Sequence, residues 1–212
     1  MPKIVDHDAQ REEIAGAAAR AIARAGLEGA TMRAVAKEAG CSTGPLAHYF
    51  GDKSRILVHA LRHTSRKTGD RMVRQLRRGR GIAALRSVLE EALPLDGTRK
   101  AEWRVWLSFW GRAATHPDLA AEQARRYEEW RVLVQGGLES ARVEGELASG
   151  LDLEREAEAI VALVDGIGIQ AMFEPSRFTP EHQLTIVDAY LERITGADSG
   201  RAGAQSPRTD RR

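Results

Sequence analysis

The sequence contains a single cysteine, Cys41, among its 212 residues. One cysteine excludes an internal disulfide framework and a four-cysteine zinc site, and this scarcity fits a reducing compartment. The chain also lacks any run of about 18 apolar residues, the length that a spanning helix needs. Its first residues, MPKIVDHDAQ, lack the apolar core of a signal peptide. These absences predict a cytoplasmic protein without membrane contact.

Alternating runs of β-branched residues are absent as well, and no internal repeat is visible. Apolar residues recur instead at three- and four-residue steps, separated by glycine and proline, which predicts an all-α fold. Residues 196–212 are rich in glycine, serine and charge, which predicts a disordered tail. The expected helices cover residues 10–25, 32–39, a segment capped by Ser42, 52–79, 81–93, 98–115, 118–147, 153–173 and 180–195.

The chain as a whole has little excess charge of either sign, with a net charge of +2, but its two halves carry opposite net charges. Residues 1–80 contain 16 lysines and arginines against 8 acidic residues, whereas residues 81–195 contain 12 against 20. A basic N-terminal part joined to an acidic remainder is typical of a module that binds a polyanion, with nucleic-acid phosphate as the obvious partner.

The segment from Thr31 to Lys53 has the form of a helix-turn-helix. Thr31 and Ser42 are suited to cap two short helices, and Gly40 is suited to end the first. Pro45 falls in the first turn of the second helix, where a backbone N–H has no helical partner. In DNA-binding proteins the second helix of such a pair enters the major groove.

The same segment resembles the TetR family of regulators, which share a Gly-x-Ser turn, an aromatic pair and a lysine three residues later. Here these are Gly40-Cys41-Ser42, Tyr49-Phe50 and Lys53. The stretches STGPLAHYF and EWRVWLSFW are most similar to the choline-sensing BetI branch. The resemblance implies a three-helix DNA-binding domain over residues 8–68 and a larger helical effector-binding and dimerisation domain over residues 69–195.

The resemblance also implies which residues contact DNA. Arg33 is expected at a base edge, because arginine can donate two hydrogen bonds to guanine, and Lys53 at a phosphate. Many relatives have tyrosine where this chain has Ala47, so one backbone contact is missing or comes from His48. The alternative is that these are surface polar residues around a small core. The expected DNA-binding residues are Thr31, Arg33, Thr43, Gly44, Pro45, Ala47, His48, Tyr49 and Lys53.

The four tryptophans all lie between residues 103 and 130. Aromatic residues at helical spacing form either a packed core or the wall of a pocket, and both alternatives stay open. A pocket of ring faces would attract an organic cation, with an acidic residue such as Glu102 balancing its charge, and the resemblance to BetI favours this alternative. The expected effector-binding residues are Glu102, Trp103, Trp106, Phe109, Trp110, Tyr127 and Trp130.

Gly166 and Gly168 lie within an apolar helix, IVALVDGIGIQAMF, and allow another helix to approach closely. We expect them at a homodimer interface formed by the helices over 153–173 and 180–195, pairing as the four-helix bundle that the resemblance implies.

Together these features predict a transcription regulator, a repressor released from palindromic operator DNA by a small-molecule effector. The alternative is a constitutive or architectural DNA-binding dimer in which the tryptophans are core. No cofactor is expected. Enzymatic activity is not expected either, because the sequence offers no set of polar groups that would converge in a pocket. No metal site is expected either, because His59 and His63 supply only two ligands.

Overall fold

The computed structural model describes residues 7–44, 46 and 53–196, and all regular structure in that part of the chain is α-helical, which confirms the predicted class. Between α2 and α4 only Thr43, Gly44 and Leu46 are described as part of a helix. The helices are α1 (His7–Gly29), α2 (Met32–Ala39), α4 (Lys53–Arg78), α5 (Gly81–Ala92), α6 (Gly97–Ala113), α7 (Pro117–Val143), α8 (Leu153–Phe173) and α9 (Pro180–Thr195).

Helix boundaries follow the predicted capping signals closely. The Thr31 side chain accepts a hydrogen bond from the backbone N–H of Ala34 at 3.2 Å, and Gly40 ends α2 in the left-handed region, with φ 65° and ψ 27°. The first helix differs from its prediction because it runs to Gly29. Gly26 nevertheless has φ 67° and ψ 178°, so the backbone breaks where the helix was predicted to end.

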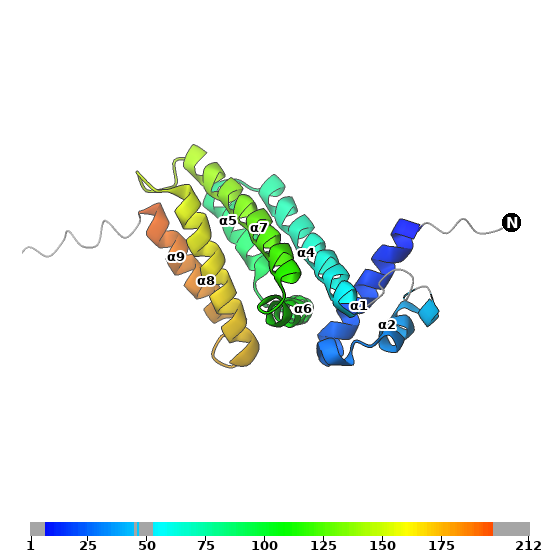
Figure 1. Ribbon diagram of the computed structural model, residues 1–212. Helices are drawn as coiled ribbons and strands as arrows, with labels where there is room; N and C mark the ends of the chain where they lie inside the picture. Colours follow the sequence, from blue (N-terminus) through cyan, green and yellow to red (C-terminus); the bar gives the residue numbers. More distant parts are fainter. Residues whose placement is uncertain (1–6, 45, 47–52, 197–212) are drawn as a thin grey trace, which may run out of the picture.

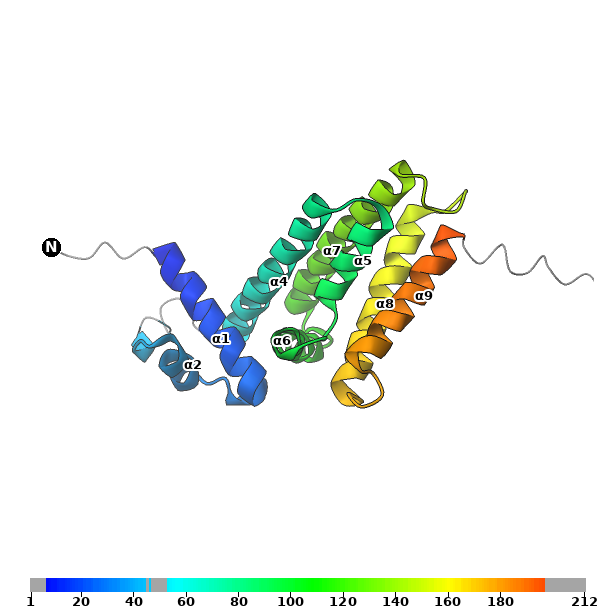
Figure 2. The same cartoon turned by 180° about the vertical axis from the view of Figure 1, so that it is seen from behind.

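Helix α4 connects the two ends of the molecule. Figure 1 shows α1 and α2 at one end and α5, α7, α8 and α9 at the other, with α4 between them. Seen from behind, in Figure 2, α6 lies across the base of this arrangement, between α1 and α8. Within the described residues, no helix combines the length and the apolar character that crossing a bilayer requires.

The first hydrophobic core lies around α1. Helix α1 buries a face of small and apolar residues, which packs with Val35 of α2 and with Ile56 and Leu57 of α4. Three residues of α6, Val105, Phe109 and Ala113, belong to the same core. The sequence did not predict this packing, which joins α6 of the second expected domain to α1 of the first.

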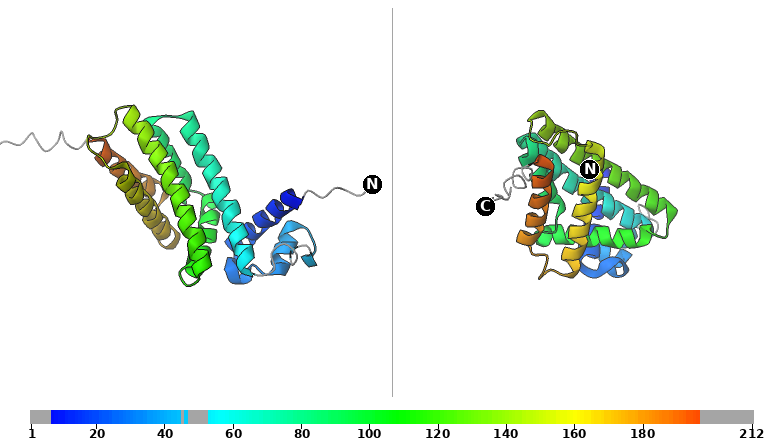
Figure 3. Two further views of the ribbon diagram at one scale, coloured as in Figure 1. Left: turned by 45° about the horizontal axis from the view of Figure 1, so that its top comes forward. Right: turned by 90° about the vertical axis from the view of Figure 1, so that its left-hand side faces the viewer.

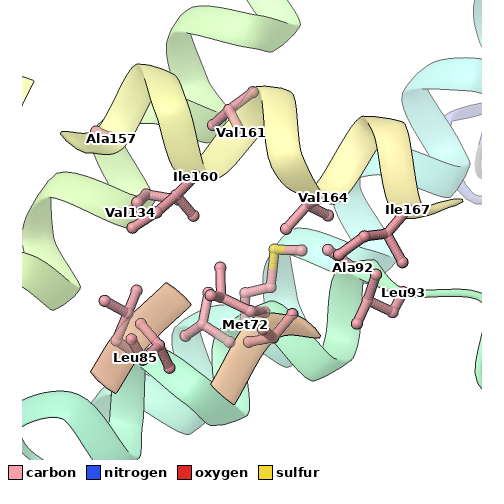
Figure 4. Close-up of a cluster of buried hydrophobic side chains, with 14 of the residues drawn as sticks. Met72, Leu85, Ala92, Leu93, Val134, Ala157, Ile160, Val161, Val164 and Ile167 are labelled. Atoms are coloured by element: carbon pink, nitrogen blue, oxygen red, sulfur yellow. The ribbon is translucent and has the colours of Figure 1, made fainter. Parts of the chain in front are cut away.

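The second hydrophobic core lies among α4, α5, α7, α8 and α9. In Figure 4, Ile160, Val164 and Ile167 of α8 face the interior opposite Met72 of α4 and Leu85 of α5. These side chains are at most 5% exposed. Burying an aliphatic side chain of this size stabilises a fold by about 1.5–3 kcal/mol, so this core supports the longer helices of the bundle.

Candidate functional site

The DNA-binding residues that the structure describes lie on an exposed surface. Thr31, Arg33, Thr43 and Gly44 are all exposed. The Thr31 hydroxyl accepts the capping hydrogen bond of α2, and because a hydroxyl also has a donor, it remains able to bind a phosphate oxygen. Among the other predicted contacts, Pro45, Ala47, His48 and Tyr49 lie outside the described residues, as does the side chain of Lys53, and all nine contacts stay predictions.

Ion pairs fix the orientation of α2 against α1. The Glu38 carboxylate accepts a hydrogen bond from Arg20 Nε at 3.0 Å and another from Arg24 Nη1 at 2.7 Å. The hydrogen bonds from Arg20 and Arg24 lower the pKa of Glu38, so it stays ionised at neutral pH. Exposed pairs contribute little stability, but two arginines on one carboxylate restrict how α2 can rotate.

A cavity of about 140 Å³ lies between α4, α6, α7 and α8, with Ala92 of α5 also in its wall. A cavity of about 150 Å³ is large enough to hold benzene, so this space suits a small organic molecule. The aromatic residues on its wall are Trp103, Trp106, Trp110, Tyr127 and Trp130. The structure therefore brings together five of the seven residues predicted to bind an effector.

The aromatic rings meet at steep angles, edge against face. Trp103 is 5.5 Å from Trp106 and 5.7 Å from Trp110 between ring centroids, with interplanar angles of 75° and 88°. Trp110 and Tyr127 are near-parallel at 6.4 Å and 23°. Such pairs contribute about 0.5–1.5 kcal/mol beyond burial. These rings line one space, and a ring face that is open to this space would attract a cation.

Trp103 is both a core residue and a wall of the cavity. It is 1% exposed, and its indole N–H donates to the carbonyl oxygen of Ala92 at 2.8 Å. A Cβ atom placed on Gly168 would lie 1.9 Å from the Trp103 ring. Gly168 is therefore buried against an indole of its own chain, and this contact explains the glycine without the expected dimer interface. Gly166 has no such neighbour within 4 Å.

Asp165 of α8 places a carboxylate at the cavity wall. The Tyr127 hydroxyl donates to Asp165 Oδ2 at 2.7 Å, and within the described residues no lysine, arginine or histidine forms an ion pair with this carboxylate. Burial raises the pKa of Asp165 to about 6, and the hydrogen bond from Tyr127 acts in the opposite direction. Near neutral pH Asp165 is therefore mostly ionised, and its carboxylate has no ion-pair partner among the described residues.

The other charges on the cavity wall are compensated. Arg126 donates to Glu129 at 2.7 Å and to Glu122 at 2.9 Å. Two polar atoms of the wall, the indole N–H of Trp110 and the side-chain oxygen of Gln123, are buried without a hydrogen-bond partner in the described part of the chain. Buried polar groups normally have partners, so these two residues of the wall each keep one unsatisfied polar atom.

Two residues predicted to bind the effector do not line the cavity. Glu102 accepts hydrogen bonds from Arg71 at 2.8 and 2.6 Å and from Thr68 at 3.2 Å, and Phe109 is fully buried in the first core. Asp165 was not predicted from the sequence, although a signal was present. Asp165 is the one charged residue in the apolar stretch from Ile160 to Phe173, and such a residue must find a polar neighbour inside the bundle.

The histidines that were considered as metal ligands have other partners. His63 of α4 forms a hydrogen bond through Nδ1 with Glu12 of α1. Across residues 7–44, 46 and 53–196, no group of three or more histidine, cysteine or acidic side chains is placed to hold a metal ion.

Comparison with known proteins agrees with this arrangement. Residues 14–60 match the bacterial regulatory proteins of the tetR family, and residues 81–196 match the BetI-type transcriptional repressor C-terminal domain. The chain is 32% identical to the HTH-type transcriptional regulator PksA of Bacillus subtilis over 98% of this chain and 100% of that one. It is 30% identical to the regulator BetI of Burkholderia thailandensis over 92% and 97% of the two chains.

A solved structure of a transcriptional regulator from Saccharomonospora viridis, in complex with choline, has a TM-score of 0.79. It is 26% identical to this chain, and the match covers 88% of this chain and 97% of the other. These matches confirm the family resemblance that was predicted from the Gly40-Cys41-Ser42 turn, the Tyr49-Phe50 pair and Lys53. The chain belongs to the TetR family of DNA-binding transcription regulators, a non-enzymatic family, and has a BetI-type C-terminal domain.

Proposed function

We propose that this protein is a homodimeric repressor that leaves a palindromic operator when a small organic cation fills the cavity between α4, α6, α7 and α8. The observation that carries this proposal is Asp165, a mostly buried carboxylate that faces an aromatic wall without a cationic partner in the described residues. A quaternary ammonium ion suits this site because it cannot donate N–H hydrogen bonds, so ring faces and a carboxylate supply the attraction.

The free polar atoms refine the class of ligand. A hydroxyl group has the chemistry that both atoms lack in a partner, since it can donate to an oxygen such as that of Gln123 or accept from an N–H such as that of the Trp110 indole. A ligand with a cationic head and a hydroxyl, such as choline, therefore matches the chemistry of the wall. The choline-bound Saccharomonospora viridis regulator, whose fold this chain shares, supports the same class.

We propose that two copies of the chain pair through one face formed by α8 and α9. An exposed stripe of small and apolar residues runs along α8 and includes Ala159, Ala162, Ile169 and Phe173, with Phe173 74% exposed. Figure 3, right, shows α8 and α9 side by side on the face turned toward the viewer. Exposed apolar surface of this kind marks interaction sites, and a two-fold pairing would match two half-sites in the DNA.

Tryptophan fluorescence is the direct test, since all four tryptophans line the cavity. The purified protein is titrated with choline and with 3,3-dimethylbutan-1-ol, a neutral compound of similar shape. We expect choline to quench the fluorescence, and we expect Asp165→Asn to weaken choline binding much more than Glu102→Gln, the control outside the wall. Equal binding of the neutral compound would show that the site selects shape and not charge.

Release of DNA is then measured with a duplex selected by the protein from a random library. Choline at saturating concentration should weaken binding of this duplex. Quenching without release would contradict the repressor mechanism and favour a DNA-binding dimer that does not respond to this ligand.

A further inference from the structure

A cluster of charges around Glu122 joins the cavity wall to α4. We call it the Glu122 clasp: Glu122, Arg125 and Arg126 of α7 and Arg62 of α4. Glu122 is 8% exposed, and Arg62 bonds both of its oxygens, with Nε 3.0 Å from Oε1 and Nη2 2.9 Å from Oε2. Arg125 contacts Oε2. The hydrogen bond from Arg62 contributes most to lowering the pKa of Glu122, to about 2.

One oxygen of Glu122 connects the ligand site to α4. Oε1 accepts from Arg62 Nε at 3.0 Å and from Arg126 Nη2 at 2.9 Å. Arg126 lines the cavity, whereas Arg62 follows Leu61, a fully buried residue of the first core that also lines the cavity. Any displacement of Arg126 therefore changes the hydrogen bonding of the oxygen that holds Arg62.

A second ionic cluster holds α4 nearer to its C-terminal end. Arg71 bonds Glu91 of α5 at 2.8 Å and Glu102 of α6 at 2.6 Å. Arg62 and Arg71 are nine residues apart in one helix, which is about 13 Å along its axis. Between the two clusters, Ser65, Thr68 and Gly69 of α4 line the cavity.

The geometry points to the Glu122 clasp as the link between ligand binding and DNA binding, with Arg62 as its positioning residue. This inference rests on the proposed function. A cation in the cavity repels the guanidinium of Arg126, because like charges at close range interact unfavourably. Arg126 still has Glu129 as a partner and can turn toward it. The shared oxygen of Glu122 then rearranges around Arg62, and the N-terminal half of α4, which packs against α1, moves with it.

The test measures coupling, defined as the factor by which saturating choline weakens binding of the selected duplex at constant salt. Coupling between two sites is typically about 5- to 150-fold. Arg62→Met should reduce it to less than about twofold, while choline affinity without DNA and duplex affinity without choline each stay within about threefold. Glu122 keeps Arg125 and Arg126 in this variant, so no buried charge is left alone. Arg62→Lys should restore part of the coupling.

Arg131→Met is the control, because it removes an arginine–glutamate pair, with Glu128, from α7, the helix that also contains Glu122. This control should leave coupling unchanged. Equal coupling in wild type and Arg62→Met would overturn the inference, while choline binding would still support the proposed function. If choline fails to bind wild type, the proposed function fails, and amide hydrogen exchange tests the clasp separately. Exchange over residues 56–66 should then be faster in Arg62→Met than in Arg131→Met, and equal exchange would overturn the clasp.

Discussion

The Asp165→Asn substitution should stabilise the free protein and weaken cation binding at the same time. Burial raises the pKa of Asp165 from 3.8 to about 6. Each unit of pKa corresponds to about 1.4 kcal/mol, so the ionised carboxylate costs about 3 kcal/mol at neutral pH. Asparagine removes this charge, and its side-chain oxygen can still accept the hydrogen bond from Tyr127. We expect the free energy of unfolding at pH 7.5 to rise by about 1–3 kcal/mol, which thermal melting should show as several degrees.

The raised pKa of Asp165 also predicts how stability and cation affinity depend on pH. Between pH 4 and 6 the native protein keeps a proton on Asp165 that the unfolded chain releases, so this group lowers stability as pH rises. A cation requires the ionised form, and its affinity should therefore fall about tenfold between pH 7.5 and pH 5. Choline titrations and melting curves at both pH values check this. Loss of stability in Asp165→Asn, together with unchanged choline affinity and no pH dependence, would refute the role of this carboxylate.

Three further predictions concern packing, DNA binding and assembly. Gly168→Ala should destabilise the protein by about 1–3 kcal/mol through overpacking against an indole, whereas Gly166→Ala, which meets no atom of its own chain within 4 Å, should cost less, as melting curves will show. Lys53→Ala should weaken binding of all duplexes and reduce the salt slope by about one, whereas Arg33→Ala should cost about 1–3 kcal/mol on the selected duplex alone. Equal effects on specific and random DNA would contradict the Arg33 assignment. Phe173→Glu should shift the protein toward monomer in sedimentation, and an unchanged mass would move the interface elsewhere.

The helices were predictable because their signals are local. Thr31 and Gly40 bound α2 as expected, since a hydroxyl cap and a left-handed glycine act within one turn of the helix. The grouping of Trp103, Trp106 and Trp110 was predictable for the same reason, because residues three and four apart share a helix face. The extension of α1 past Gly26 was not predicted. The backbone is not helical at Gly26 itself, but helical turns continue after it to Gly29.

The partners of charged residues were harder to predict, because they depend on contacts between distant segments. Glu102 stands beside the tryptophans in the sequence but pairs with Arg71, 31 positions earlier. Asp165 is distant from the tryptophans in the sequence but reaches Tyr127, 38 positions earlier. Phe109 shares α6 with three of the cavity tryptophans, yet it is fully buried in the first core and does not line the cavity. Helical spacing places residues on a face, but only tertiary packing decides what that face meets.

The cavity and its charge indicate how the proposed ligand would control this protein. An open cavity among aromatic side chains forfeits packing contacts, and the raised pKa of Asp165 shows that its charge is unfavourable in the free protein. A cation that fills the space would supply the missing packing contacts and neutralise the carboxylate. Part of its binding free energy would therefore come from removing these two unfavourable features of the free protein. Because the same wall includes residues of α4, and α4 packs in both cores, this energy is available to shift the position of the DNA-binding segment.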